Sequence, residues 1–246
     1  SRLNDLAKVF SSEKIIPASV TFVDIAGIVK GASEGAGLGN KFLANIRESD
    51  AICQVLRAFT DDDVVHVEGR VSPKEDMETI NTELILADMQ SLEKAIPRLE
   101  KEIRLDKSKV VVLEAAQKAQ EILNEGKTLF SVGFDVEPIR ELFLLTTKPF
   151  VYVVNADEVE LSNADFRTEM KALVAPAEVV FLDAKIESEL VEMSDEDALE
   201  LLESVGQTES GLKALARVGF DALGLQTYLT AGPKEARAWT IPRNAT

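Results

Sequence analysis

An aspartate and a glycine follow a short apolar run near the start of the chain, and their spacing suits nucleotide binding. The run is Val20 to Val23, and Asp24, Ile25, Ala26 and Gly27 give the pattern D-x-x-G. A carboxylate at the carboxyl end of a parallel strand can reach a nucleotide-bound Mg²⁺, directly or through water. Gly27 has no Cβ, so its backbone N–H can approach a terminal phosphate. Four residues are a weak signal alone, but their place at a strand end favours Asp24 as a metal ligand and Gly27 as a phosphate contact.

A glycine-rich segment comes next, from Gly31 to Phe42, with four glycines among its first nine residues. Because ordering glycine costs much conformational entropy, we expect this segment to be held in place by a ligand, as a switch is. The segment fits neither the P-loop pattern nor the dinucleotide-binding glycine pattern. Gly126-Lys127-Thr128 resembles the end of a P-loop, but Glu121 stands where its first glycine is required.

A second apolar run, Phe150 to Val154, also delivers polar groups at its end: Asn155, Asp157 and Glu158 around Ala156. Ligands of open α/β sheets bind at the carboxyl ends of the strands. The guanine-reading motif of such a site is N-K-x-D, in which the Asp accepts from the guanine ring N–H and amino group. A longer Glu crowds the guanine amino group, whereas adenine has a ring acceptor at the neighbouring ring nitrogen. The sequence therefore predicts relaxed or adenine-leaning base selection; an ordinary polar loop is the alternative.

Apolar runs and helical patterns alternate over most of the chain, which predicts a parallel sheet with crossover helices. Each run is short and mostly apolar, as strands covered on both faces must be. The predicted strands are Val20 to Val23, Ile52 to Ala58, Phe150 to Val154 and Val179 to Leu182. The predicted helices are Lys41 to Ser49, Pro138 to Leu145, Ala164 to Val174, Asp195 to Ser204 and Leu212 to Leu223.

The region from Met77 to Gly126 breaks this alternation with two helical patterns around a charged turn at Leu105 to Ser108. Apolar residues recur at alternating steps of three and four, which is typical of a coiled-coil seam. They are Ile85, Met89, Leu92, Ile96, Leu99 and Ile103 in the first arm, and Val112, Ala116, Ala119 and Leu123 in the second. We predict an antiparallel helical hairpin with a kink or local break at Pro97. It is either a projecting arm for a partner or a self-contained structural unit.

Composition limits the location and the partners. The chain has 246 residues and a formal net charge of −16, from 27 Lys and Arg against 43 Asp and Glu. This acidity argues against a broad basic surface for nucleic acid. There is no apolar run long enough to span a membrane and no signal-peptide pattern. The single Cys53 cannot form an internal disulfide, which suits a reducing compartment. We therefore expect a cytoplasmic protein.

Several segments together resemble the YchF/EngD family of Obg-like ATPases, and the match runs over nearly the whole chain. They are Asp24 to Phe42, Ala44 to Glu48, Asn155 to Glu158, Leu225 to Tyr228 and Ala238 to Ile241. The resemblance implies an α/β P-loop NTPase of the translation-factor class, with a mainly parallel sheet, interrupted by the hairpin and followed by a small β-rich TGS-type domain. On this basis we expect a G domain over residues 1–76 and 130–227, the hairpin over 77–129, and the start of the TGS-like domain over 228–246.

The resemblance also implies a function. It predicts binding and slow hydrolysis of ATP, with GTP possible as a second substrate, Mg²⁺ as the cofactor and the ribosome as the partner. By position, Asp24 and Gly27 belong to switch II, Asn155, Ala156 and Glu158 read the base, and Ala184 lies in the final nucleotide-binding loop. A strict GTPase remains an alternative, as does a non-catalytic interaction module that uses the hairpin.

The residue that assists hydrolysis departs from the common GTPase pattern. Family members carry a hydrophobic residue where many GTPases have a water-orienting Gln, and Ile28 follows Gly27 here. His66 matches a family histidine proposed to assist hydrolysis, and a neutral imidazole could hydrogen-bond the attacking water. A partly exposed histidine on a loop or edge strand is the alternative.

The family's phosphate loop and switch I Thr are expected before Ser1, and most of its TGS domain after Thr246. A chain without the phosphate loop lacks the backbone cradle and the Lys that hold a triphosphate. We therefore expect residues 1–246 alone to bind nucleotide poorly and to be inactive, unlike the full-length parent.

Overall fold

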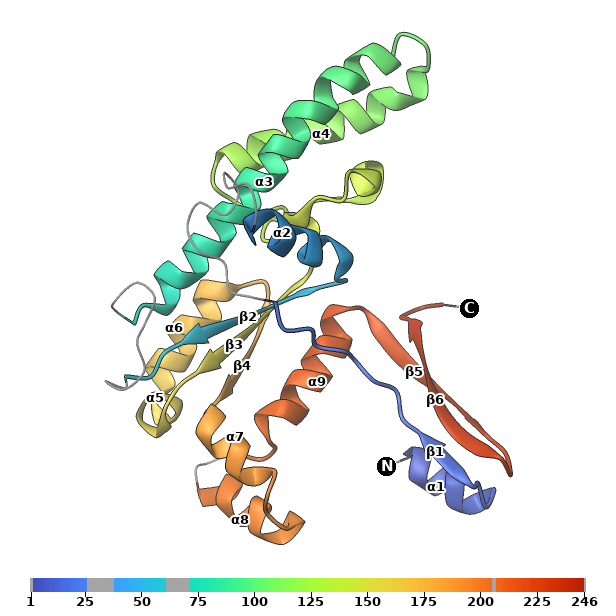
Figure 1. Cartoon of the computed structure of the whole chain (residues 1–246), viewed down its shortest axis with the longest axis vertical. Helices are drawn as coiled ribbons and strands as arrows, with labels where there is room; N and C mark the ends of the chain where they lie inside the picture. The colour runs from blue at the N-terminus through green and yellow to red at the C-terminus, as the bar shows by residue number, and fades with distance from the viewer. Residues whose placement is uncertain (1, 26–37, 61–70, 205–206, 246) are drawn as a thin grey trace.

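The computed structural model describes residues 2–25, 38–60, 71–204 and 207–245. In this part of the chain a parallel sheet lies at the centre, a helical hairpin extends from it, and a smaller sheet lies beside both termini (Figure 1). The parallel sheet has the order β2-β3-β4, formed by β2 (Ile52–Arg57), β3 (Phe150–Asn155) and β4 (Glu178–Leu182). The three strands confirm the predicted parallel α/β arrangement and three of the four predicted strands.

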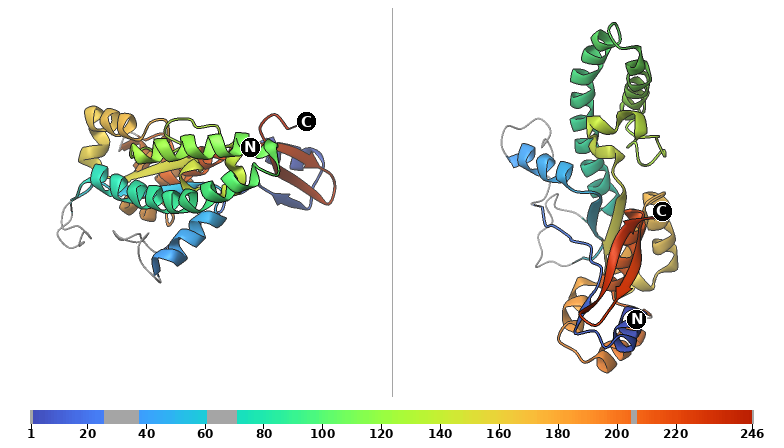
Figure 2. Two further views of the ribbon diagram at one scale, coloured as in Figure 1. Left: turned by 90° about the horizontal axis from the view of Figure 1, so that it is seen from above. Right: turned by 90° about the vertical axis from the view of Figure 1, so that its right-hand side faces the viewer.

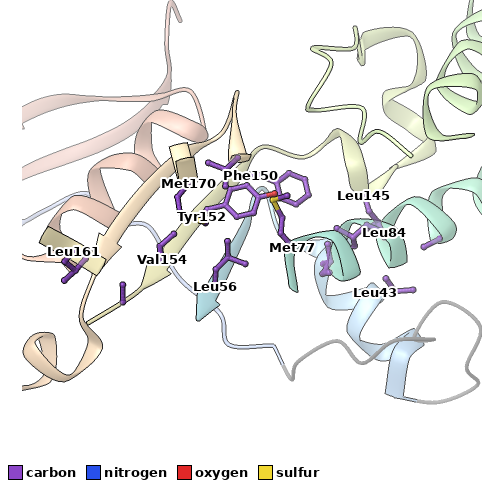
Figure 3. Close-up of a cluster of buried hydrophobic side chains, with 14 residues drawn as sticks. Leu43, Leu56, Met77, Leu84, Leu145, Phe150, Tyr152, Val154, Leu161 and Met170 are labelled. Atoms are coloured by element: carbon purple, nitrogen blue, oxygen red, sulfur yellow. The ribbon is translucent and has the colours of Figure 1, made fainter. Parts of the chain in front are cut away.

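The central strand β3 is covered on both faces, which explains its unbroken apolar sequence. One face packs against α2 (Leu38–Glu48), the base of α3 (Pro73–Glu102) and α6 (Ala164–Val174), in the cluster of Figure 3. The other face packs against α9 (Gly211–Ala222). The sheet is therefore the middle layer of an α/β sandwich. Since both faces of its central strand are covered, the carboxyl ends of the strands are the place where a ligand can bind.

Short helices surround the carboxyl edge of the sheet. They are α5 (Glu158–Ser162), α7 (Ala184–Leu190) and α8 (Asp195–Ser204). The helices predicted at 164–174 and 195–204 are confirmed with the same bounds, and those predicted at 41–49 and 212–223 agree within three residues. Helices α5, α6 and α7 each have an N-cap residue whose side chain accepts hydrogen bonds from backbone N–H groups of the first turn. These residues are Asp157, Asn163 and Asp183.

A second sheet combines strands from both ends of the chain, and only its strand near the start, β1 (Lys14–Ile16), has no counterpart among the predicted elements. The sheet has the order β1-β6-β5, with β1 parallel to β6 (Glu235–Pro242) and β5 (Leu225–Ala231) antiparallel to β6. Helix α1 (Arg2–Val9) packs its Leu3 and Ala7 against Ala236 of this sheet. The start of the chain is therefore joined to its end.

The predicted strand at Val20 to Val23 is wrong, because these residues form no strand pairing. A Cβ at Gly219 of α9 would lie 3.5 Å from Phe22 Cζ and 3.6 Å from Val20 Cγ1. Val20 and Phe22 thus lie beside α9, while Phe22 and Val23 remain exposed, so this run lacks the two covered faces of a central strand.

The predicted helix at Pro138 to Leu145 is also wrong. Two 3₁₀ turns, at Glu137–Leu142 and Leu145–Thr147, replace it, and Phe143 between them has a left-handed backbone with φ 50°. The backbone N–H groups of Leu145 and Thr146 donate to Asp88 of α3. Those amides are then unavailable to the carbonyls of a helix.

The helical hairpin is confirmed. Helix α3 and helix α4 (Val110–Asn124) run antiparallel, and a 3₁₀ turn at Lys107–Lys109 precedes α4 (Figure 2). Six residues of the predicted seam are buried: Ile85, Leu92, Leu99, Ala116, Ala119 and Leu123. The other four, Met89, Ile96, Ile103 and Val112, are partly buried, and Leu113 is buried next to Val112. Helix α3 continues through Pro97, so of the predicted kink or local break the break is wrong and the kink stays a prediction. Pro97 is exposed, and the carbonyl that loses its partner there can bind water.

Candidate functional site

The end of β3 is joined to the start of α7 through one side chain. Asn155 is the last residue of β3 and is half-buried, and its Oδ1 accepts a hydrogen bond of 3.0 Å from the backbone N–H of Ala184. Ala156 follows with its N–H donated to the Leu182 carbonyl at 3.0 Å, and its methyl group is buried. The two segments that were predicted to read the base therefore lie together. Because the methyl group of Ala156 is buried, this residue can contact a ligand only through its backbone.

The two carboxylates after β3 have different environments. Asp157 is the N-cap of α5, and its Oδ1 accepts from the N–H of Val159 at 3.0 Å and of Glu160 at 3.3 Å. A hydrogen bond with the Glu160 carboxyl, together with these backbone bonds, lowers the pKa of Asp157. The same side-chain hydrogen bond, together with burial, raises the pKa of Glu160. Glu158 is exposed and forms no hydrogen bond or ion pair with any residue that the structure describes. Glu158 is therefore the carboxylate that a ligand can use.

Arg57 is a neighbour that the sequence did not reveal. It is the last residue of β2 and pairs with Asn155 across the sheet, where the Ala58 N–H donates to the Asn155 carbonyl at 2.8 Å. The Arg57 guanidinium lies 4.5 Å from the centre of the Phe59 ring, and its Nε donates to the Phe59 carbonyl. A cation near the end of a mostly apolar run was the available signal. The edge thus carries an amide, a carboxylate and a guanidinium.

Asp24 is exposed, and it forms no hydrogen bond with Asn155 or Glu158 in the described structure. Its neighbour Ile25 packs against the core cluster that includes Val154 and Ala156. Gly27, Ile28, His66 and most of the glycine-rich segment lie outside the described residues. Within the described residues no group of three or more His, Cys, Asp and Glu side chains could hold a metal ion.

A buried polar cluster joins the base of the hairpin to the turn that precedes β3. The Asp88 carboxylate, 1% exposed, accepts from Leu145 N–H at 2.7 Å, from Thr146 N–H at 2.8 Å and from Thr146 Oγ1 at 2.7 Å. Burial raises the pKa of Asp88 despite these bonds. Lys148, two residues further, donates from Nζ to the Arg47 carbonyl at 3.2 Å and to the Ser49 carbonyl, at the end of α2. Burial lowers the pKa of Lys148.

A surface hollow of about 580 Å³ lies elsewhere, between α4 and residues 132–138. Its lining includes Lys118, Ile122 and Phe134, and none of the candidate residues. In the part of the chain that is described, no helix has both the length and the apolarity needed to cross a bilayer.

Comparisons with known proteins give a consistent result. A model of a family described as 50S ribosome-binding GTPase matches residues 7–115. The protein named ribosome-binding ATPase YchF of Haemophilus influenzae is 46% identical over 251 residues, which cover 100% of this chain and 69% of that protein. Its namesake in Bacillus subtilis is 45% identical over 98% of this chain and 69% of the relative. The solved structure of the Schizosaccharomyces pombe YchF GTPase has a TM-score of 0.81 at 32% identity, covering 99% of this chain and 68% of that one.

Proposed function

The chain belongs to the YchF family, and we propose that it binds ATP with Mg²⁺, also accepts GTP, hydrolyses the nucleotide slowly and acts as a switch on the ribosome. Membership agrees with the resemblance read from the sequence and with the predicted P-loop NTPase fold class. A partner such as the ribosome implies a cytoplasmic location.

The observation that carries the proposal is the bond between Asn155 and Ala184. With Oδ1 of Asn155 accepting from the Ala184 N–H, its Nδ2 amide is left to donate to a ligand. Both purines present an acceptor at N7. Asn155 would therefore hold either purine, and the choice between them would fall to Glu158.

Glu158 favours ATP because its side chain is longer than that of Asp and because its carboxylate is exposed. Its carboxylate is exposed at the first position of α5, while Asp157 is bound to the backbone of the same helix. A carboxylate one methylene longer than Asp reaches further into the space of the guanine amino group. We therefore propose that guanine is accommodated less well than adenine, without being excluded.

The remaining roles concern the phosphates and the metal. One or two protein carboxylates, completed by phosphate oxygens and water, suffice to hold Mg²⁺ in nucleotide sites. The exposed carboxylate of Asp24 fits this requirement. Gly27 would donate its N–H to the terminal phosphate, and His66 would position the attacking water, since the hydrocarbon side chain of Ile28 cannot.

Two rival functions remain open to test. A strict GTPase is favoured by the wording GTPase in the description of the solved structure and of the matching family. A non-catalytic interaction module is favoured by the projecting hairpin (Figure 1).

Calorimetric titration of the full-length protein with ATP and with GTP, both with Mg²⁺, distinguishes these functions. We expect tighter binding of ATP, and a shift towards GTP of about 10-fold, or about 1.4 kcal/mol, in the Glu158→Asp variant. Asn155→Ala should weaken both nucleotides by about 10-fold, the value of one hydrogen bond. The matched control is Glu169→Asp on the exposed face of α6. Absence of heat at millimolar ATP and GTP would contradict the nucleotide-dependent function.

A further inference from the structure

The hairpin carries its connecting turn far from the parallel sheet. Figures 1 and 2 show α3 and α4 extending side by side to a turn at the far end of the molecule, away from the β2-β3-β4 sheet and both termini. We call residues 98–109 the hairpin tip. Helix α3 ends at Glu102, so the tip lies about 21 Å along the helix from Asp88, where α3 is held.

The tip has the opposite charge to the rest of the chain. Its five cations and three carboxylates give a net charge of +2 in a chain of −16. Arg98 pairs with Glu102 at 3.5 Å, and Asp106 accepts from Ser108 N–H at 2.9 Å and from Ser108 Oγ at 2.7 Å. Three further cations are exposed and form no ion pair with the residues that the structure describes: Lys101, Arg104 and Lys107.

The tip also has a fixed shape and an exposed apolar residue at its centre. The N–H groups of Leu105 and Asp106 both donate to the Glu102 carbonyl at 2.9 Å. The seam below is closed by Leu99 and Leu113, both buried. Leu105 itself is 94% exposed. A surface that is ordered before binding loses little conformational entropy when it docks.

We propose that the hairpin tip docks on the phosphate backbone of ribosomal RNA, with Lys101, Arg104 and Lys107 as phosphate contacts and Leu105 against a ribose or base. The inference rests on the proposed ribosome partner. Phosphates favour exposed cations that have no carboxylate partner, because their charge is not already neutralised.

The length of the hairpin supports RNA as the occupant. A body with a strongly negative charge is repelled by RNA, and this repulsion is screened over about 8 Å at physiological salt. The roughly 21 Å between the tip and Asp88 exceeds two such lengths. The hairpin therefore brings a small cationic surface to RNA while the acidic body stays outside the range of the strongest repulsion.

The test measures binding of the full-length protein to purified ribosomes between 50 and 200 mM salt. The triple variant Lys101→Gln, Arg104→Gln, Lys107→Gln is compared with the control Arg2→Gln, Lys171→Gln, Lys213→Gln, in which three exposed cations elsewhere are removed. Three lost phosphate contacts lower the slope of log K against log salt by about 2 to 3, so the difference in affinity between the two variants narrows by about 30-fold over this range. ATP hydrolysis without ribosomes is expected to be the same in both.

Each outcome decides a different point. An unchanged slope and affinity in the tip variant, with normal binding of the wild type, would overturn this inference alone. Loss of affinity with an unchanged slope would assign the tip to a protein surface and overturn RNA as the occupant. Failure of the wild type to bind ribosomes would instead remove the ribosome from the proposed function and this inference with it. Leu105→Ser should weaken binding without changing the slope.

Discussion

Replacing Asp88 by Ala should loosen the contact between the base of the hairpin and the turn that leads into β3. The carboxylate is buried and is the acceptor for three donors from two consecutive residues, Leu145 and Thr146, which are themselves fully buried. Water cannot reach these donors without a local opening. The substitution therefore leaves three polar groups without partners in the interior.

The expected cost follows from these contacts. Each buried donor that loses its partner destabilises the protein by about 1 to 3 kcal/mol. Part of this is recovered, because burial raises the pKa of Asp88 and so shows that the carboxylate incurs a desolvation cost. We expect a net loss of about 3 to 5 kcal/mol for Asp88→Ala, in the range for breaking a buried polar network. Thr146→Val removes one bond and should cost about 1 kcal/mol.

Urea unfolding of the two single variants and the double variant measures the coupling. After Asp88→Ala, the Thr146 hydroxyl has no acceptor, so Thr146→Val should then cost nothing, which gives a coupling of about 1 kcal/mol. Amide hydrogen exchange at Leu145 and Thr146 should accelerate in Asp88→Ala. Asp5→Ala, an exposed carboxylate on α1, is the control and should stay within about 0.5 kcal/mol of the wild type. A cost below about 1 kcal/mol, or additive single effects, would refute the reasoning.

Two further predictions concern Tyr152 and His66. Burial raises the pKa of Tyr152 to about 12 from 10.0. The folded protein therefore favours the neutral phenol. The contribution of this phenol to the free energy of unfolding is complete below pH 10 and is lost as the pH rises to 12. The unfolding free energy of the wild type relative to Tyr152→Phe should fall by about 2.7 kcal/mol over that interval, and a constant difference would contradict it. His66→Ala in the full-length protein should slow nucleotide hydrolysis while leaving nucleotide affinity similar, and unchanged turnover in a single-turnover assay would remove His66 from the mechanism.

The sequence predicted best those elements whose signal is local and periodic. The seam of the first arm recurs at alternating steps of four and three from Ile85 to Ile103, and Leu92 and Leu99 occupy its buried face as expected. The apolar run of β3 needs two covered faces, and only the centre of a sheet offers both. In each case the pattern itself contains the reason for the burial.

Elements that depend on distant partners were predicted less well. The apolar run at Val20 to Val23 was predicted as a strand, but no described strand pairs with it, and Val20 and Phe22 lie beside α9 instead. Strand β1 exists because Lys14–Ile16 lies against β6, more than 200 residues later in the chain. The helix predicted at 138–145 is replaced because Asp88, 57 residues away from Leu145, takes its amide. No local pattern contains these partners.

The candidate site shows the same division. Asn155 and Glu158 were identified from their position after an apolar strand. The distinction between Asp157 and Glu158 depended on the start of α5, which commits the first to the backbone and leaves the second exposed. The bond to Ala184 required the register of β3 with β4, which brings the ends of both strands to the same level.

The polar cluster at Asp88 also joins the hairpin to the helix that follows the glycine-rich segment. Lys148 binds carbonyl groups at the end of α2, and Asp88 binds the adjoining turn, so α2 and α3 contact one short stretch, residues 145–148. Leu43 of α2 and Leu84 of α3 lie in the same buried cluster (Figure 3). A shift of α2 on nucleotide binding would therefore act on the hairpin base. A rotation of about 5° there would move the tip, about 21 Å away, by about 2 Å. Loosening this cluster with Asp88→Ala should then reduce the effect of nucleotide on ribosome binding.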